Sequence, residues 1–241
     1  MNKAIGIAAT DLSIGYGNKV VRSALSFSLM SGEMVCLLGP NGCGKSTLLR
    51  TLAGLQLPLG GTTSFASLTQ QERAKRLALV LTERNSPDHT SVHDIVAMGR
   101  YPYTSFLGAL SERDEQVISQ SLDAVQMQGY AQRMFSSLSD GESQRILIAK
   151  ALAQQTPVIL LDEPTAFLDL PNRLHLMRLL QSLAHEQEKT ILISTHELDL
   201  ALHLADRILL LSPQGLRLDT PQRLLSDDAL TLAFGMDVLH Y

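Results

Sequence analysis

The sequence predicts an α/β fold in which a mainly parallel sheet is interrupted by a helical insertion. Short apolar runs, "VILLD", "TILIST" and "RILLLS", are separated by segments with helical periodicity such as "RLHLMRLLQSLAHEQ". Strands that alternate with helices are typical of a parallel sheet covered on both faces. Between about residues 83 and 155 the pattern is predominantly helical. We therefore expect an α/β core from residues 1–82 and 156–241, and a helical subdomain from residues 83–155.

Length and composition fit a globular protein. A chain of 241 residues is long enough to bury a core without disulfides, and 45% hydrophobic and 18% charged residues are ordinary values. No stretch approaches the eighteen consecutive apolar residues that would span a bilayer. The first residues lack an apolar segment followed by a small-residue cleavage site. We expect a cytoplasmic protein.

The charge pattern and the cysteines exclude two classes of function. The net charge is −4, and Lys and Arg are spread along the chain, so no basic stripe is available for nucleic-acid phosphates. Cys36 lies in the apolar run "MVCLL" and Cys43 in a glycine-rich loop. Neither has the spacing of a metal site or a disulfide framework. We expect one buried small residue and one tolerated loop residue.

The N-terminal part is predicted to form strands. Leu25, Phe27 and Leu29 alternate with serines, as expected of a half-buried strand. A turn at residues 31–32 then leads into the continuous apolar run Met34 to Leu38. An uninterrupted run of this kind is typical of a strand buried on both faces.

Three helix starts can be located from spacing. Residues 46–55 carry leucines at helical intervals directly after the glycine-rich loop. Further along, Ser91 with Asp94 and Ser111 with Asp114 have the spacing of a capping box. In that motif the serine accepts from the backbone of the third helical residue, whose carboxylate reaches back. Both pairs predict helices in the insertion.

The glycine-rich loop "GPNGCGKST" fits the phosphate-binding loop pattern, with a buried strand before it and a helix after it. Its glycines let backbone N–H groups point at phosphates, Lys45 adds a point charge at the β- and γ-phosphates, and Ser46 offers a hydroxyl to Mg²⁺. An idle glycine turn is the alternative, which the flanking strand and helix disfavour. The predicted phosphate-binding residues are Gly39, Pro40, Asn41, Gly42, Cys43, Gly44, Lys45, Ser46 and Thr47.

A second motif, "VILLDEPT", delivers two carboxylates to the end of a buried strand. Ligands of open α/β sheets bind at the carboxyl ends of the strands. Asp162 is then the candidate Mg²⁺ partner, and Glu163 the candidate general base that polarises an attacking water. The alternative is a solvated turn, because Pro164 and Thr165 are residue types common in turns.

Taken together, these motifs resemble those of the ATP-binding cassette (ABC) ATPases over essentially the full length of the chain. The order is similar to theirs: "GPNGCGKST", "LSDGE", "ILLDEP", the pair Leu168-Asp169, and "STHE" with His196. The resemblance implies a P-loop NTPase (RecA-like) core with an N-terminal antiparallel β subdomain, and hydrolysis of ATP with Mg²⁺. It also implies that His196 contacts the γ-phosphate and the attacking water, although a lone histidine is often structural.

The resemblance further implies that "LSDGE" contacts the γ-phosphate of ATP held by a second protomer, so that a homodimer clasps two nucleotides. Ser139 and Glu142 have capping-box spacing, which predicts that the Glu142 carboxylate is engaged with the backbone. Gly141 leaves its N–H accessible, and the helix dipole favours an anion there. The family usually has Gly and Gln where this chain has Asp140 and Glu142. We therefore expect slower or more tightly gated hydrolysis, with Asp140 turned outward.

Two more positions are assigned by the resemblance. The family usually has a Gln after the strand of "LALVLTER" that contacts Mg²⁺ or water, and the matching residue here is Glu83, with Thr82 as the alternative. Tyr16 stands where the family places an aromatic that stacks on adenine. A core tyrosine is the competing interpretation of Tyr16, because aromatic side chains bury readily.

The stretch "VAMGRYPYTSFLG" and the segment "FLDLPNR" are similar to importers of iron chelates (siderophores), haem and cobalamin. Tyr101, Pro102, Tyr103 and Phe106 form an aromatic cluster suited to docking a partner helix, unless the rings pack inside the insertion. The resemblance implies separate membrane permease subunits, an external or periplasmic substrate-binding protein, and a position on the inner face of the cell membrane. The alternatives are a soluble iron–sulfur assembly factor, the ATPase subunit of a different ABC transporter, and a nucleic-acid clamp. The acidic balance disfavours the clamp.

Overall fold

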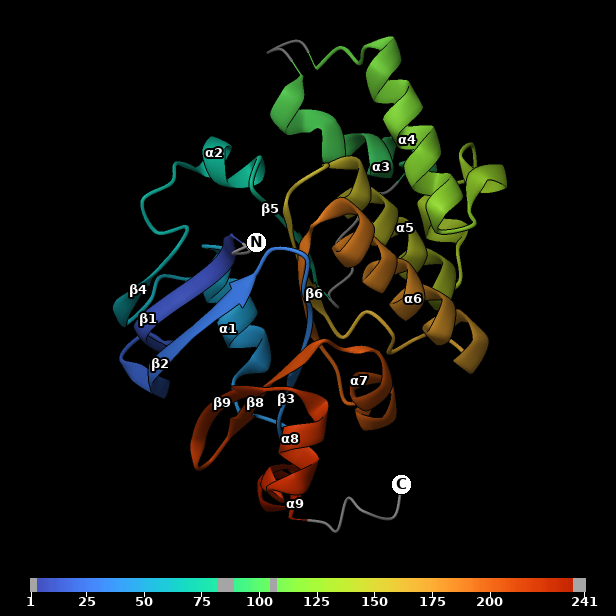
Figure 1. The fold of residues 1–241 in the computed structure, drawn as a ribbon. Coiled ribbons are helices and arrows are strands. Elements are labelled where there is room, and N and C mark those ends of the chain that lie inside the picture. The colour runs from blue at the N-terminus through green and yellow to red at the C-terminus, as the bar shows by residue number, and fades with distance from the viewer. Residues whose placement is uncertain (1–3, 82–88, 105–107, 236–241) are drawn as a thin grey trace.

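The computed structural model describes residues 4–81, 89–104 and 108–235, and it contains two sheets flanked by helices (Figure 1). The strands are β1 (Ile5–Tyr16), β2 (Lys19–Met30), β3 (Met34–Leu38), β4 (Gly60–Thr63), β5 (Leu77–Val80), β6 (Val158–Asp162), β7 (Thr190–Ser194), β8 (Arg207–Ser212) and β9 (Gly215–Asp219). The α-helices are α1 (Lys45–Leu52), α2 (Gln70–Ala74), α3 (Val92–Ala97), α4 (Glu112–Ala124), α5 (Asp140–Ala153), α6 (Leu170–Gln187), α7 (Leu198–Leu204), α8 (Pro221–Ser226) and α9 (Ala229–Phe234). Three 3₁₀ turns are η1 (Met98–Tyr103), η2 (Gln128–Tyr130) and η3 (Phe135–Ser137).

The larger sheet has the strand order β5-β6-β7-β3-β8-β9. All its neighbouring strands are parallel except β8 and β9, which form an antiparallel pair at one edge. The parallel core and the helix–strand alternation confirm the predicted α/β class. β3 lies inside the sheet, and all five of its residues are buried. Its continuous apolar run is explained by this position, since both faces of the strand are covered.

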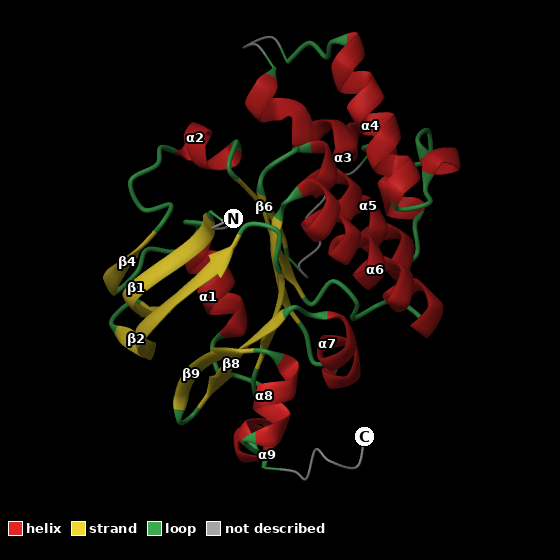
Figure 2. Cartoon of the chain, in the orientation of Figure 1, coloured by secondary structure: helices red, strands yellow, loops and turns green. Residues whose placement is uncertain are grey.

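Each face of the larger sheet packs into its own hydrophobic cluster. Met34, Cys36 and Leu38 join the cluster formed with α3 to α7, whereas Val35 and Leu37 join the cluster that contains α1 and the strands β1 and β2. Successive side chains of a strand point to opposite faces, so one short strand contributes to both clusters. Figure 2 shows the two layers, with α1 and the smaller sheet on one side of the large sheet and α6 and α7 on the other.

The smaller sheet, of order β2-β1-β4, is antiparallel throughout. Leu25, Phe27 and Leu29 on β2 are all buried, which confirms the predicted half-buried strand. The sheet packs α1 against the larger sheet, so that the loop before α1 lies between the two sheets. This arrangement matches the antiparallel subdomain that the resemblance implies.

Helix α1 ends three residues earlier than the sequence predicts. Gly54 adopts φ +71°, and the N–H of Leu55 donates to the carbonyl of Arg50 at 2.9 Å while that of Gly54 donates to Thr51 at 3.0 Å. These two bonds form a Schellman cap, in which a left-handed glycine closes the helix. Leu55 therefore lies outside the helix and is 65% exposed. Its helical spacing in the sequence was a coincidence.

Between β5 and β6 the described chain is helical, with α3, η1, α4, η2, η3 and α5 in succession. Ser91 with Asp94 opens α3, and Ser111 with Asp114 opens α4, each through a complete capping box as predicted. The exact limits of the subdomain, residues 83–155, stay a prediction. Within the described ranges, no helix has both the length and the apolar character needed to cross a membrane.

Candidate functional site

The predicted phosphate-binding loop connects the end of β3 to the start of α1. A side chain at Gly39 would lie 2.1 Å from the carbonyl oxygen of Leu211 on β8, so only glycine fits where the loop leaves the sheet. The Lys45 side chain is buried, and its ammonium donates to the carbonyl oxygens of Gly39 at 2.8 Å and Pro40 at 3.3 Å. The loop therefore wraps around a positive charge at the amino-terminal end of α1.

A cavity of about 290 Å³ opens in front of this loop. It is lined by Tyr16, Val21, Asn41, Gly42, Gly44, Lys45, Ser46, Thr47, Glu163 and His196. Residues from "GPNGCGKST", "VILLDEPT" and "STHE", which are far apart in the sequence, thus meet at one place. Gly39, Pro40 and Cys43 belong to the same loop but are not part of the cavity lining. Cys43 is buried, and burial raises the pKa of its thiol.

Tyr16 stands at the rim of the cavity. Its side chain is 54% exposed, and its hydroxyl lies 3.0 Å from the Thr47 hydroxyl oxygen. The competing interpretation, a core tyrosine, is therefore wrong. An exposed ring tethered beside a phosphate-binding loop can offer a flat face to a base, and stacking on adenine stays a prediction.

The two carboxylates at the end of β6 have different environments. Asp162 is buried, and it accepts a hydrogen bond of 2.5 Å from the Ser194 hydroxyl. Glu163 lies in the cavity wall, and its backbone adopts φ +47°. A left-handed conformation costs a non-glycine residue about 1 kcal/mol or more, and such strain is concentrated at functional sites. The solvated-turn alternative does not account for a buried Asp162 and a Glu163 that faces a cavity.

Glu163 and His196 form a close pair. The Nε2 of His196 lies 2.7 Å from a carboxylate oxygen of Glu163, and both side chains are partly exposed to the cavity. A carboxylate at this position can accept a proton from water, and the imidazole can hold the carboxylate in one orientation. The geometry thus brings together the predicted base and the predicted histidine.

Two residues that sequence reasoning missed hold this arrangement. Besides binding Asp162, the Ser194 hydroxyl accepts the backbone N–H of Glu163 at 3.0 Å. Arg173 donates to the carbonyl of Leu168 at 2.6 Å and pairs with Glu197, the neighbour of His196, at 3.2 Å. The signal for Ser194 was its place at the end of a buried strand, opposite Asp162 in the parallel register.

The stretch "LSDGE" begins helix α5 as predicted. The Glu142 carboxylate accepts the backbone N–H of Ser139 at 2.8 Å, and the Ser139 hydroxyl accepts the N–H of Glu142 at 3.3 Å, completing a capping box. These bonds from Ser139, together with Tyr130 and the guanidinium of Arg133, lower the pKa of Glu142. The Glu142 carboxylate is therefore ionised and engaged, whereas Asp140 is exposed.

The start of α5 lies against a different part of the site from the phosphate loop. A side chain at Gly141 would approach the carbonyl oxygen of Phe167 to 3.1 Å, next to the Leu168-Asp169 pair that leads into α6. Asp169 caps α6, accepting from the backbone N–H of Asn172 at 3.2 Å. Among described residues, none from 138 to 142 lines the 290 Å³ cavity.

Two of the three predicted metal ligands, Ser46 and Asp162, lie among the described residues. Ser46 lines the cavity, and Asp162 ends β6, which β7 separates from β3 in the large sheet. A hydroxyl and a carboxylate are oxygen donors that suit Mg²⁺. Within the described part of the chain, no group of three or more His, Cys, Asp or Glu is placed to hold a metal ion. Glu83 and its alternative Thr82 lie outside the described residues.

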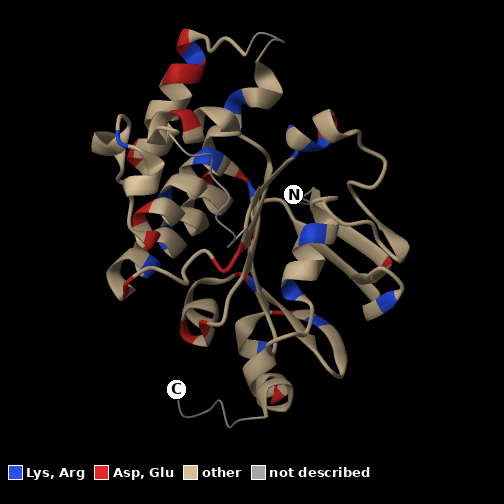
Figure 3. Ribbon diagram, turned by 180° about the vertical axis from the view of Figure 1, so that it is seen from behind, with Lys and Arg blue, Asp and Glu red and all other residues tan. Residues whose placement is uncertain are grey.

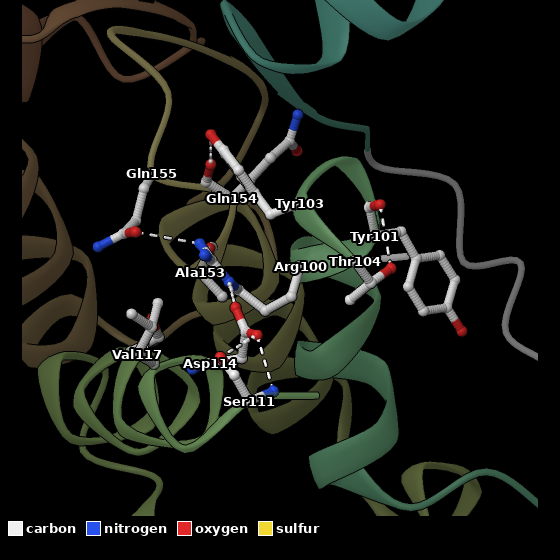
Figure 4. Close-up of polar contacts among 11 residues, drawn as sticks. Arg100, Tyr101, Tyr103, Thr104, Ser111, Asp114, Val117, Ala153, Gln154 and Gln155 are labelled. Carbon is white, nitrogen blue, oxygen red and sulfur yellow. Dashed lines mark hydrogen bonds and ion pairs between the residues drawn. The ribbon is translucent and has the colours of Figure 1, made fainter. Parts of the chain in front are cut away.

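Tyr101 and Tyr103 of the aromatic cluster both lie at the surface of the insertion, although Tyr103 also contacts its neighbours. Tyr101 is 60% exposed, and Figure 4 shows its ring directed away from the neighbouring polar cluster. Tyr103 lies under the Arg100 guanidinium, 4.3 Å from ring centroid to Cζ, and its hydroxyl donates to the carbonyl of Gln154 at 2.9 Å. Phe106 lies outside the described residues. The two described tyrosine rings therefore do not pack inside the insertion, and docking of a partner helix stays a prediction.

Comparison with known proteins gives a consistent result. The profile of the ABC transporter family matches residues 23–166, more than half of the chain. A Bacillus subtilis protein named as the probable ATP-binding protein of a siderophore transport system is 36% identical over 237 residues, covering 96% of this chain and 86% of that protein.

Two solved structures extend the comparison. The first is an inward-facing ABC transporter provisionally assigned to the metal-chelate type, with a TM-score of 0.84 and 36% identity over 97% of this chain and 90% of that one. The second is the dimeric structure of a bacterial ABC transporter cassette, with a TM-score of 0.80 and 25% identity over 89% of this chain and 98% of that one.

Ser194→Ala is expected to slow ATP hydrolysis about tenfold, because supporting residues of this kind typically contribute 10- to 100-fold to activity. The change removes the bonds that orient Asp162 and the Glu163 backbone. Steady-state phosphate release measures the effect. Ser212→Ala is the matched control, since Ser212 is a buried serine at the end of β8 whose hydroxyl bonds only Gly215 among described residues. Equal rates for the two variants would show that Ser194 does not support the site.

Proposed function

The chain belongs to the ABC transporter family, and from this premise we propose that it is the ATP-hydrolysing subunit of an importer for iron–siderophore complexes, haem or cobalamin. In this proposal two copies of the chain form a homodimer and energise separate permease subunits in the membrane. The homodimer lies at the inner face of the cell membrane, and a periplasmic or extracellular binding protein delivers the cargo to the permease.

The observation that carries the homodimer is the division of the site. The cavity is lined by residues of the phosphate loop, the candidate base and the histidine, whereas the amino-terminal end of α5 contributes nothing to its lining among described residues. Ser139 caps that helix, and Gly141 presents backbone N–H where the helix dipole is positive. The cavity of one copy and the amino-terminal end of α5 of the other are complementary half-sites. A second copy therefore supplies the half that the cavity lacks.

In this proposal the chain's own groups divide the work of hydrolysis. The loop N–H groups and Lys45 hold the phosphates, and Glu163 accepts a proton from the attacking water. His196 orients Glu163 through the 2.7 Å contact and reaches toward the γ-phosphate. Ser46 and Asp162 would hold Mg²⁺, which neutralises charge on the β- and γ-phosphates when it is bound.

The class of cargo is inferred from the relatives and from the "GRYPY" segment of the insertion. The Bacillus subtilis relative is named for siderophore transport, and the inward-facing transporter is assigned to the metal-chelate type. An iron–sulfur assembly factor without a membrane partner is the second candidate, and the exposed Tyr101 favours the importer because it suits a docking surface. Figure 3 shows Lys and Arg interspersed with Asp and Glu over core and insertion, which gives no support to a nucleic-acid clamp.

Coexpression with candidate permeases tests the proposal. The matching permease is expected to copurify with this chain and to stimulate its ATPase, because the permease and the nucleotide cycle are coupled. Permeases of iron-chelate, haem and cobalamin importers are compared with permeases of unrelated cargo as controls. Copurification with soluble iron–sulfur assembly proteins, and with no permease of the set, would favour the second candidate.

The shared site also predicts how the two departures in "LSDGE" act. Asp140 is exposed at the helix end that would face a γ-phosphate, so Asp140→Asn is expected to raise turnover about fivefold, equivalent to about 1 kcal/mol for one like charge in water. Glu142→Gln is the matched comparison and is expected to leave turnover within about twofold, because glutamine also completes a capping box. Steady-state ATPase assays measure both. The double variant Asp140→Gly/Glu142→Gln removes both carboxylates. If its turnover and that of Asp140→Asn equal the wild-type turnover, the two carboxylates do not affect hydrolysis.

A further inference from the structure

Arg100 is a buried charge that the nucleotide site does not use. The residue lies on η1 and is only 4% exposed. Its guanidinium donates to Asp114 at 2.8 Å, to the carbonyl of Ala153 at 2.7 Å and to the side chain of Gln155 at 3.0 Å (Figure 4). One side chain therefore joins η1, the start of α4 and the end of α5.

The acceptors around Arg100 compensate for the burial of its charge. Asp114 also completes the capping box of α4, and hydrogen bonds from Ser111 and then from Arg100 lower its pKa to about 2. The carbonyl of Ala153 belongs to the last turn of α5, where the helix dipole favours a cation. Lysine cannot replace this contact, because only the rigid guanidinium fork reaches several acceptors in different directions at once.

The turn η1 is fixed to the end of α5 by two further contacts. A side chain at Gly99 would lie 2.3 Å from the carbonyl of Lys150, so the backbones of η1 and α5 touch. Tyr103 packs under Arg100 and donates to the carbonyl of Gln154. These contacts make η1 and the last turn of α5 one unit.

That unit is also attached to the core. The Gln154 amide donates to the carbonyl of Ala74 at 2.6 Å and to that of Leu77 at 3.0 Å, at the entry to β5. The carboxyl end of α5 is thus tied to the large sheet. The opposite end of α5 carries Ser139 and Gly141, and 14 helical residues separate the two ends by about 21 Å.

We propose that Arg100 is a positioning residue for the stimulation of ATP hydrolysis by the permease. It clamps η1 to the carboxyl end of α5, which Gln154 ties to the large sheet. A permease segment pressing on the exposed Tyr101 then pivots α5 about that end and moves Gly141 at the far end. The inference rests on the proposed function, because it assumes that a permease contacts this face. The inference adds the residue that transmits the effect of permease contact to the nucleotide site.

The test compares basal and permease-stimulated ATPase of the full chain. Arg100→Lys keeps the charge and loses the fork, so stimulation of kcat is expected to fall about fivefold, within the range of residues that carry coupling between sites. Basal kcat and the KM for ATP are expected to stay within about twofold, because Arg100 is not part of the cavity lining. Tyr103→Phe removes one hydroxyl contact from a partly exposed ring and is expected to give a smaller loss of stimulation.

Arg217→Lys is the matched control, since Arg217 pairs with Asp219 and Asp227 in the core, outside the insertion. Stimulation of Arg100→Lys equal to that of the wild type would overturn the inference. A parallel fall of basal and stimulated rates would also overturn it, because it would indicate a general structural role. If Arg100→Lys does not fold, undiminished stimulation of Tyr103→Phe overturns it. A wild-type chain that no permease stimulates overturns the proposed function and this inference with it.

Discussion

The site depends on the parallel register of three neighbouring strands. β7 lies between β3 and β6, and Ser194 at its end is aligned with Leu37 on one side and with Asp162 on the other. The phosphate loop follows β3, Glu163 follows β6 and His196 follows β7, so this register brings all three to one edge of the sheet. A shift of one residue would turn Asp162 toward the opposite face and remove it from Ser194. The Ser194–Asp162 bond is therefore a structural contact of the sheet at the place where we propose the functional site.

Helix α5, the last helix before β6, is held at both of its ends. Its amino-terminal end is closed by the Ser139 and Glu142 capping box, which leaves the positive end of the helix available to an anion. Its carboxyl-terminal end is held by the Arg100 guanidinium and tied to the core through Gln154. The negative carboxyl end of the helix dipole is thus paired with Arg100. The positive amino end is proposed to be paired with the nucleotide.

Much of this arrangement could be predicted from the sequence, because it depends on local patterns. The continuous run Met34 to Leu38 and the capping pairs at Ser91, Ser111 and Ser139 are set by burial and by backbone hydrogen bonds within a few residues. The end of α1 was wrong in the prediction, since the leucine spacing continued beyond the glycine that closes the helix.

Contacts between segments distant in the sequence could not be predicted in the same way. Arg100 contacts partners 14 to 55 residues away, and Ser194 binds Asp162, 32 residues away, on a neighbouring strand whose place in the sheet the sequence does not specify. Arg173 pairs with Glu197, which follows a different strand. A serine ending one strand does not reveal that Asp162 ends the adjacent one. The division of the site between two copies stays a proposal for the same reason. The motifs "GPNGCGKST" and "LSDGE" do not indicate whether they meet within one chain or between two chains.

Disulfide crosslinking between two tagged copies tests that division most directly. One copy carries Asn41→Cys in the phosphate loop and the other carries Ser139→Cys at the start of α5, both with Glu163→Gln to slow hydrolysis. The native Cys36 and Cys43 are buried, which limits competing reactions. The shared-site account predicts a crosslink between the two tags that requires ATP. A crosslink formed within one chain when a single copy carries both cysteines, and none between copies, would contradict it.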